Sequence, residues 1–262
     1  MKYEFFARTD CGRVRTNNED AVSIDVQTKV AVLADGMGGY SAGEVASGMA
    51  TDFIQTEMAR WLGQSITPPS SQDIRRALEM CVDNANQAIY AAALANCDYA
   101  GMGTTVVAGV LSGDRLVLAH VGDSRCYRWR AGVLKQITHD HSWLQEQVDA
   151  GLLTLQQAAV SPSRNLVTRA LGVEPIVEVE INEFKMEAHD VLLMCSDGLS
   201  EMLSADEIAT LLSIHETLEE KTTRLIAAAN ANGGRDNISV LLVQAGQAER
   251  RPGFIARWLR AA

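Results

Sequence analysis

The chain has 262 residues, of which 47% are apolar and 21% charged, and this composition is typical of a globular protein with a substantial core. The formal net charge of −10 argues against a nucleic-acid-binding surface over the body of the protein. The five cysteines include no C-x-x-C pair, which favours free thiols over a disulfide framework or a zinc site. No apolar run approaches about 18 residues and no signal-peptide core is present, so we expect a cytoplasmic protein without an integral membrane segment.

Three strands are predicted at the N-terminal end of the chain. They cover residues 3–9, 21–26 and 30–34. The turn between the second and third strands is short, so these two strands should be antiparallel. The polar segment 15–20 should then lie near the end of the sheet that carries Asp35.

Two long helices follow these strands. The first begins at Ser41, which can form a capping box with Glu44, and extends to about residue 62. The second covers about residues 72–96, and both helices have apolar residues at helical spacing. Two such helices side by side form one layer packed on a sheet.

The remainder of the chain is richer in strands. Residues 141–172 are more polar and mostly helical, and we interpret them as an insertion over one edge of the sheet. Later helices begin at Ser204, which can form a capping box with Glu207, and at about residue 218. Further strands are predicted at 104–111, 115–121, 126–129, 133–137, 176–185, 190–195 and 238–243. This order suits two sheets with helices outside them.

Four aspartates stand at the ends of apolar strands. Asp35, Asp123 and Asp197 each follow one, and Asp236 precedes the last predicted strand. If that strand pairs antiparallel with residues 190–195, Asp197 and Asp236 meet at one rim of the sheet. Carboxylates gathered there repel one another unless cations lie among them. Oxygen ligands without His or Cys favour Mg²⁺ or Mn²⁺ over zinc, and two such ions can activate a shared water.

Other interpretations of these residues are weaker. Asp35 and the glycines after it resemble a dinucleotide-binding turn, but the third expected glycine falls on Ser41 and Asp35 would face the pyrophosphate. His120 alternates with apolar residues, so a half-buried structural role is favoured over catalysis. His139 and His141 flank Asp140, and a role near the substrate is the minor alternative for them.

Seven short motifs occur in a characteristic order along the chain. They are residues 15–20 (RTNNED), 35–39 (DGMGG), 43–46 (GEVA), 103–105 (GTT), 122–125 (GDSR), 196–199 (SDGL) and 235–238 (RDNI). In this order and spacing the chain resembles the bacterial members of the protein phosphatase 2C family, which are metal-dependent serine/threonine phosphatases. The resemblance covers roughly residues 5–245.

The resemblance implies an α+β fold. This fold is a four-layer αββα sandwich, in which helices flank two antiparallel sheets and a binuclear metal centre lies between the sheet edges. The catalytic domain would cover residues 1–245, with a flap insertion at about 141–172, and a basic tail would follow at 246–262. The tail carries aromatic and aliphatic residues among arginines. We expect it to pack on the domain or to fray, and binding to a membrane surface or a partner is the minor alternative.

The resemblance also implies a metal site with two Mn²⁺ or Mg²⁺ ions and allows a weaker third. Asp35 would bridge both ions, and the Gly36 carbonyl would bind one of them. Asp197 and Asp236 would complete the shell of the other ion. Asp123 matches the position that holds the third ion in bacterial relatives.

Four further positions follow from the same resemblance. Glu19 and Asp20 would act through metal-bound waters. Arg15 would grip the substrate phosphate, since its planar fork suits two oxygens. Met37 stands where eukaryotic relatives have a histidine that is a proposed general acid, so the proton for the leaving group would come from a metal-bound water or another residue. In the flap, residues 161–165 (SPSRN) lack the His-Pro that often precedes Arg-Asn in bacterial relatives.

The implied reaction is hydrolysis of a phosphomonoester by a hydroxide that bridges the two ions, without a phosphoenzyme or a cysteine nucleophile. The substrates would be phosphoserine and phosphothreonine proteins, and the enzyme would be a monomer that opposes a Ser/Thr protein kinase. The alternative is a catalytically silent relative that binds phosphoproteins as a regulator. The intact set of Arg15, Asp35, Asp197 and Asp236 argues against that alternative.

Overall fold

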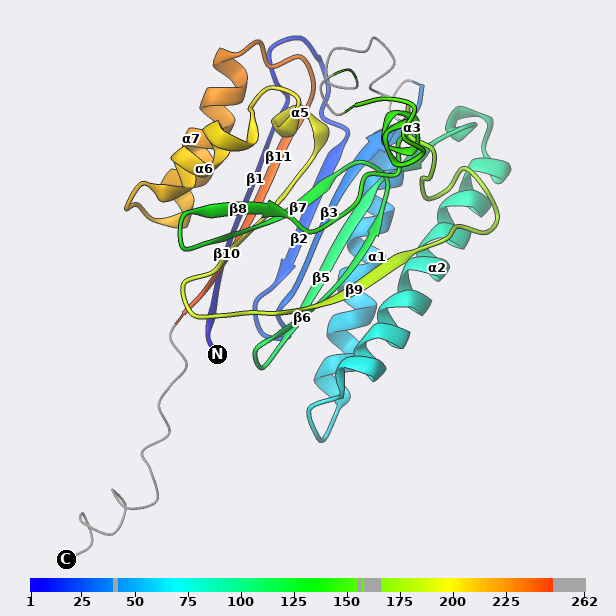
Figure 1. The fold of residues 1–262 in the computed structure, drawn as a ribbon. Helices are drawn as coiled ribbons and strands as arrows, with labels where there is room; N and C mark the ends of the chain where they lie inside the picture. Colours follow the sequence, from blue (N-terminus) through cyan, green and yellow to red (C-terminus); the bar gives the residue numbers. More distant parts are fainter. Residues whose placement is uncertain (40–41, 155–156, 158–165, 247–262) are drawn as a thin grey trace, which may run out of the picture.

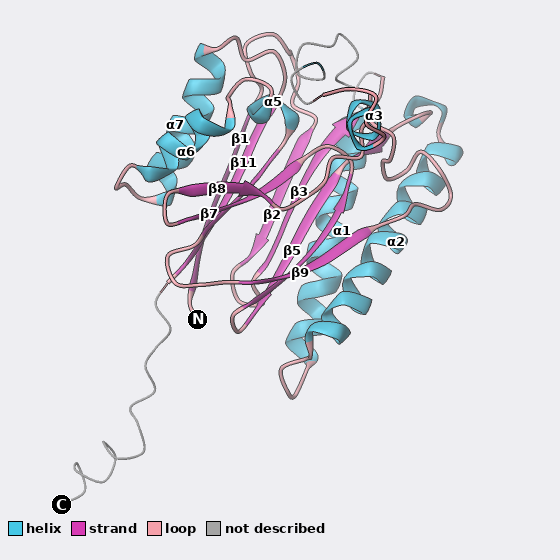
Figure 2. Ribbon diagram, viewed as in Figure 1, coloured by secondary structure: helices cyan, strands magenta, loops and turns pink. Residues whose placement is uncertain are grey.

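The computed structural model describes residues 1–39, 42–154, 157 and 166–246. Two antiparallel sheets lie face to face, and helices cover the outer face of each (Figure 1; Figure 2). The predicted α+β fold with an αββα sandwich is therefore confirmed. No helix within the described ranges is long and apolar enough to cross a membrane. All five cysteines are free, as the sequence predicted.

The five-stranded sheet has the order β1-β11-β10-β7-β8. Cys195 at the end of β10 lies opposite Val240 near the start of β11, so the predicted antiparallel pairing of these strands is confirmed. The segments that flank this pair, after β10 and before β11, therefore meet at one rim. The strands are β1 (Tyr3–Asp10), β7 (Arg125–Arg130), β8 (Val133–Gln136), β10 (Val191–Cys195) and β11 (Ile238–Ala245).

The six-stranded sheet has the order β2-β3-β5-β6-β9, with the short β4 paired to the end of β3. The predicted antiparallel pairing of β2 and β3 is confirmed, and its register sets Asp20 opposite Asp35. Two carboxylates thus face each other across neighbouring strands. The strands are β2 (Asp20–Asp25), β3 (Val30–Met37), β4 (Gly103–Thr104), β5 (Val106–Ser112), β6 (Arg115–Val121) and β9 (Glu180–Lys185).

Helices cover both sheets. The long helices α1 (Ala42–Gln64) and α2 (Ser71–Ala95) pack on the six-stranded sheet, and the 3-10 turn η1 (Cys97–Tyr99) follows them. Helices α6 (Ala205–Ser213) and α7 (Leu218–Ala231) cover the other sheet. Two short helices, α3 (Trp143–Asp149) and α5 (Asp197–Ser200), lie at the rim where the strand ends meet (Figure 1).

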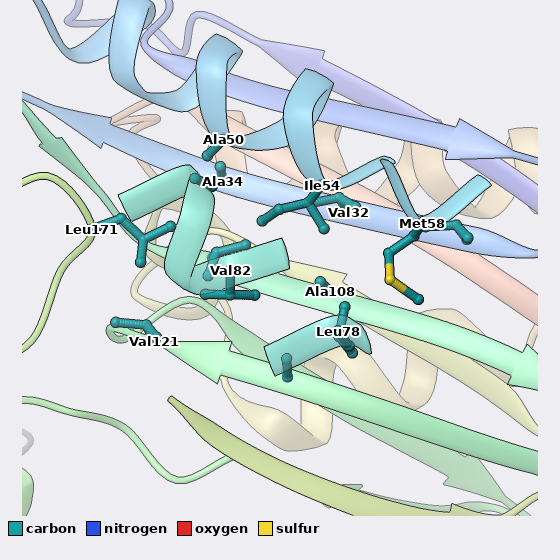
Figure 3. Packing of buried hydrophobic residues seen from close by; sticks show 14 of the residues in the cluster. Val32, Ala34, Ala50, Ile54, Met58, Leu78, Val82, Ala108, Val121 and Leu171 are labelled. Carbon is teal, nitrogen blue, oxygen red and sulfur yellow. The ribbon is translucent and has the colours of Figure 1, made fainter. Parts of the chain in front are cut away.

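The alternation of side chains along β3 explains why a strand forms here. Val32 and Ala34 pack against the α1 and α2 side, where Ile54 and Leu78 are fully buried (Figure 3). Leu33, on the opposite face, packs into the apolar layer between the two sheets. Both faces of β3 are therefore buried, which accounts for its nearly continuous apolar sequence.

Several predicted boundaries differ from the structure. Strand β3 continues to Met37 instead of ending at residue 34, because Gly36 and Met37 pair with β4. Strand β9 begins at Glu180 instead of residue 176, because its pairing with β6 begins where Glu180 lies opposite His120, next to the last residue of β6. Helix α2 has a capping box that the prediction missed, between Ser70 and Asp73.

The insertion at 141–172 is less helical than predicted within its described part. Helix α3 is followed by turns, and isolated bridges join Ser142 to Val167 and Thr104 to Leu171. The predicted cap Ser41, flap residues 161–165 and the tail beyond Gly246 lie outside the described residues.

Candidate metal centre

A cavity of about 300 Å³ opens at the rim between the two sheets, and seven of the eight predicted site residues line it. Asp20 is buried beside this cavity instead of lining it. The β1–β2 loop and the chain before β11 reach the same end of the molecule (Figure 1). The lining consists of Arg15, Glu19, Asp35, Gly36, Met37, Gly38, Thr105, Asp123, Val167, Asp197 and Asp236.

Backbone hydrogen bonds fix Asp35 within its strand. The Asp35 N–H donates to Oγ1 of Thr105 at 3.0 Å, and the Thr105 N–H donates to the Asp35 carbonyl at 2.9 Å. The Thr104 hydroxyl donates to the same carbonyl at 2.9 Å. The two threonines of the GTT motif therefore hold the Asp35 backbone and leave its carboxylate to the cavity.

Gly36 is required by the close approach of three chain segments. Its N–H donates to the Glu19 carbonyl at 3.1 Å. A Cβ at this position would overlap the carbonyl oxygens of Gly43 and Glu19. The absence of a side chain thus lets the start of α1 and the β1–β2 loop pack against the end of β3.

The five-stranded sheet supplies the other carboxylates. Asp197 is the first residue of α5, directly after β10, and Asp236 stands just before β11. Nη2 of Arg15 donates to Oδ2 of Asp236 at 2.7 Å, and the Asn237 N–H donates to Oδ1 at 2.9 Å. The candidate phosphate-binding arginine is therefore held at the rim by a candidate metal ligand.

Burial and mutual repulsion disfavour the ionised forms of the aspartates at this rim. Desolvation, followed by repulsion from Asp20, raises the pKa of Asp35 well above its usual range. Desolvation and the charge of Asp123 also raise the pKa of Asp197 well above its usual range. Burial raises the pKa of Asp20 and that of Asp123 to about 6 each. The group can carry its full negative charge at neutral pH only if cations compensate it.

The oxygen atoms at this rim are suitable ligands for divalent cations. Oδ2 of Asp20 accepts a hydrogen bond from the Ser196 hydroxyl at 2.8 Å, but its buried Oδ1 has no partner among the described residues. An unsatisfied buried carboxylate oxygen beside an oxygen-lined cavity is a natural ligand for a hard ion. The residues present thus fit Mg²⁺ or Mn²⁺, directly or through water.

A family model described as Protein phosphatase 2C matches residues 9–242. The chain belongs to this family. The serine/threonine phosphatase Stp of Listeria innocua is 39% identical over 248 residues, which are 93% of this chain and 96% of that relative. The phosphatase PstP of Mycobacterium tuberculosis is 41% identical over 239 residues, which are 91% of this chain and 44% of PstP.

Solved structures of protein phosphatase 2C relatives superpose closely on this chain. A crystal structure of Mycobacterium tuberculosis PstP/Ppp has a TM-score of 0.86 at 38% identity, covering 94% of this chain and 100% of that one. The catalytic domain of PstP in complex with two manganese ions has a TM-score of 0.81 at 37% identity, covering 94% and 99%. The family is metal-dependent, and that relative holds two ions.

A second cluster in this phosphatase fold, made of His120, His141 and Glu180, offers ligand atoms within 4.8 Å of one another. The Gly122 N–H donates to Nδ1 of His141 at 3.1 Å, so the neutral ring carries its proton on Nε2. That nitrogen faces the Glu180 carboxylate at 3.5 Å and has no lone pair for an ion. Hydrogen bonding, not metal binding, therefore explains the contact between His141 and Glu180.

His120 is more deeply buried than predicted. Its side chain is 2% exposed and lies against His141, with ring centroids 4.6 Å apart. Burial, followed by the charge of His141, lowers the pKa of His120 to about 3, so the ring is neutral. This environment agrees with a structural role.

Asn237 is a residue whose importance the sequence reasoning missed. Its side-chain Oδ1 accepts from the Glu19 N–H at 2.8 Å, and its amide donates to the Cys11 and Asn17 carbonyls at 3.1 and 2.8 Å. One side chain thus holds the loop that carries Arg15 and Glu19. Its place directly after Asp236 in the RDNI motif was the available signal.

Proposed function

We propose that this member of the protein phosphatase 2C family hydrolyses phosphoserine and phosphothreonine in proteins at the rim cavity. One observation carries the proposal: Asp35 in β3 lines the same cavity as Arg15, Asp197 and Asp236, and the last two flank the paired ends of β10 and β11 in the other sheet. Acidic residues that hold hard cations, next to a guanidinium for the phosphate, are the parts that metal-assisted phosphoryl transfer requires.

The ion-binding roles are assigned within this cavity. Asp35, the Gly36 carbonyl, Asp197 and Asp236 would hold two Mn²⁺ or Mg²⁺ ions. Glu19 and Asp20 would act through water. Glu19 lines the cavity, and Asp20 is buried opposite Asp35 on the neighbouring strand. Asp123 would hold a weaker third ion. Bound divalent ions supply Lewis acidity at the phosphoryl group and activate water for the attack.

Arg15 would bind the substrate phosphate. Its side chain is 51% exposed, and its hydrogen bond to Asp236 keeps the guanidinium beside the cavity. This contact leaves donors of the fork for phosphate oxygens.

Residue 37 would not supply the proton for the leaving group. Met37 lines the cavity, but its thioether has no proton to donate. A cysteine nucleophile is not needed: Cys195 is fully buried, and burial raises the pKa of its thiol to about 12.

The biological setting is part of the same proposal. A phosphatase of this class would oppose a Ser/Thr protein kinase in the cytoplasm, as a monomer. Residues 1–245 would form the catalytic domain, with the flap at about 141–172, and residues 246–262 a basic tail. The net charge of −10 supports partners other than nucleic acid.

Hydrolysis of p-nitrophenyl phosphate and of a phosphothreonine peptide, each with and without Mn²⁺, tests the proposal. We expect turnover of both substrates that disappears on chelation and returns with added ion. Binding of the phosphopeptide without turnover at saturating Mn²⁺ would instead support the catalytically silent alternative.

A further inference from the structure

His141 is a buried side chain that the proposed reaction does not use. It lies between β8 and α3, and it is 6% exposed. Its ring lies against His120, and its Nε2 faces the Glu180 carboxylate at 3.5 Å. Burying an imidazole costs free energy unless its nitrogens have partners, so the partner of Nδ1 indicates what the ring does.

Two hydrogen bonds join His141 to Gly122, in the turn between β6 and β7. The His141 N–H donates to the Gly122 carbonyl at 2.8 Å, and the Gly122 N–H donates to Nδ1 of His141 at 3.1 Å. Burial, followed by the charge of Arg169, lowers the pKa of His141, so the ring is neutral at pH 7 and Nδ1 can accept. Both polar backbone groups of Gly122 are therefore held by one residue.

The other end of the same turn is held by Thr105. The hydroxyls of Ser124 and Thr105 lie 2.8 Å apart and share a hydrogen bond. Gly122 has a φ of +106°, and a Cβ there would overlap the Thr105 side chain, so the turn requires glycine. Asp123 stands between Gly122 and Ser124, and the position of its carboxylate is thus fixed from both sides.

His141 also anchors the chain that returns from the flap insertion. Its carbonyl accepts from the Thr168 N–H at 2.9 Å, and an isolated bridge joins Ser142 to Val167. Val167 and Asp123 both line the metal cavity, whereas His141 is not among the described residues that line it. His141 therefore connects two parts of the cavity wall from behind.

Of these hydrogen bonds, only the one from the Gly122 N–H to Nδ1 depends on the ring. The others are backbone bonds that most residues at position 141 could make. Loss of the ring would leave the Gly122 N–H unpaired in a buried turn, which costs about 1–3 kcal/mol unless the turn moves. Glycine has no side chain to resist such a movement, so Asp123 would be displaced with it.

We infer that His141 is a positioning residue for the third ion, because its Nδ1 holds the turn that carries Asp123. This role rests on the proposed phosphatase function, in which Asp123 holds a weaker third ion. A ligand fixed by surrounding hydrogen bonds binds an ion more tightly than a mobile one. The ions held by Asp35, Asp197 and Asp236 should depend less on His141.

Three substitutions separate the acceptor at Nδ1 from the rest of the ring. His141→Asn keeps an acceptor oxygen near the position of Nδ1. His141→Gln keeps a polar group near the position of Nε2 and loses the acceptor for Gly122, and His141→Ala loses both. We expect the weaker Mn²⁺ site to lose about 10-fold in affinity in the Gln and Ala variants and to stay close to wild type in the Asn variant. Titration calorimetry of Mn²⁺ into each metal-free protein measures this.

His139→Ala is the matched control. His139 is exposed and bonds to Asp149, away from the turn, so its loss should leave Mn²⁺ binding unchanged. Equal Mn²⁺ affinities in wild type and His141→Gln would overturn the inference, and so would equal losses in the Asn and Gln variants. Because this comparison uses two polar side chains, it decides the question even if the alanine variant does not fold.

The Asp123→Asn background shows whether His141 acts through Asp123. The measured quantity is the Mn²⁺ concentration that gives half-maximal turnover of a phosphothreonine peptide. Asp123→Asn should raise it, and His141→Gln should then add little, because two substitutions that remove the same interaction are not additive. An equal further increase in this background would show that His141 acts on something other than Asp123.

The two proposals fail in different ways. No Mn²⁺-dependent turnover by the wild-type protein would overturn the proposed phosphatase function and the role of His141 with it. Turnover by a wild-type protein that binds only two ions, or turnover with wild-type Mn²⁺ affinity in every His141 variant, would contradict only the role of His141.

Discussion

At the scale of single residues, Asp35 shows how burial and repulsion can define a binding site. It faces Asp20 across paired strands and shares the rim with Asp197 and Asp236. Each carboxylate raises the free energy of ionising the others, and this cost falls when a cation enters. Without bound ions, this repulsion should lower the free energy of unfolding. The effect should be measurable by substituting single aspartates.

The variant Asp35→Asn should separate activity from stability. We expect turnover to fall by about 100- to 1,000-fold or more, because the proposed bridging ligand loses its charge. The metal-free protein should melt at a higher temperature than wild type at pH 7.5, because one repelling charge is gone. Calorimetry with and without Mn²⁺ measures this, with Asp52→Asn on the exposed side of α1 as the control. A variant with wild-type rates would remove Asp35 from the proposed site.

The variant Arg15→Ala should weaken phosphate binding. A hydrogen bond to a charged group contributes about 1.5–3 kcal/mol, so kcat/KM should fall by about 10- to 100-fold. Arg15→Lys should recover only part of the loss, because lysine lacks the planar fork. Arg13→Ala, an exposed arginine of the same loop, is the matched control and should keep wild-type kinetics. Similar losses in both alanine variants would indicate a general charge effect instead.

Sequence patterns predict some of these residues better than others. Asp35, Asp197 and Asp236 could be found because each stands at the end of an apolar strand, and strand pairing brings such ends together. The contacts Arg15–Asp236 and Arg125–Asp140 could not be predicted, because they depend on side-chain conformations that sequence spacing does not fix. Asn237 was overlooked because its side chain acts by hydrogen bonding to the backbone of a loop more than 200 residues earlier in the chain, which spacing does not reveal.

At the scale of elements, the end of β3 is where the sheet, the β1–β2 loop and α1 meet. The prediction ended this strand too early because it counted only apolar residues, whereas the pairing with β4 continues through Gly36 and Met37. The pairing with β2 places Asp35 within the sheet as well. The carboxylate is thus attached to a hydrogen-bonded strand instead of a free turn, and its position should be precise.

The variant Gly36→Ala tests this packing. The new methyl group would overlap two backbone carbonyls, which cannot move as a flexible side chain does. We expect a loss of about 1–3 kcal/mol in the free energy of unfolding and a weaker activation by Mn²⁺. Gly48→Ala, inside α1 where a Cβ has open space, should be neutral or stabilising because alanine favours helix. Equal effects in the two variants, measured by urea denaturation, would contradict this account.

At the scale of the whole molecule, the acidic rim should couple stability to pH. A group whose pKa is higher in the folded than in the unfolded state stabilises the fold at low pH and loses this effect as pH rises through the folded value. For Asp20 and Asp123 the window runs from about 4, the unfolded value, to about 6. For Asp35 and Asp197 it extends higher.

The melting temperature of the metal-free protein should therefore fall between pH 5 and pH 7.5. The stabilisation by Mn²⁺ should grow over the same range, because the ligands must lose protons to bind the ion. Differential scanning calorimetry at several pH values, with chelator or with Mn²⁺, measures both trends. The pH dependence of the chelated Asp35→Asn variant should be weaker than that of wild type; an identical dependence would show that other groups cause it.

The rim also affects how tightly the two sheets are held together. Away from the cavity, the two sheets adhere through apolar side chains such as Leu33 and Met194. At the cavity, carboxylates of opposite sheets stand next to each other and push apart. A coordinated ion would act there as a cross-link between the sheets. Chelation should then loosen the sandwich at one end only, and the gain or loss of a cofactor would change the width of the entrance through which a phosphoprotein must pass.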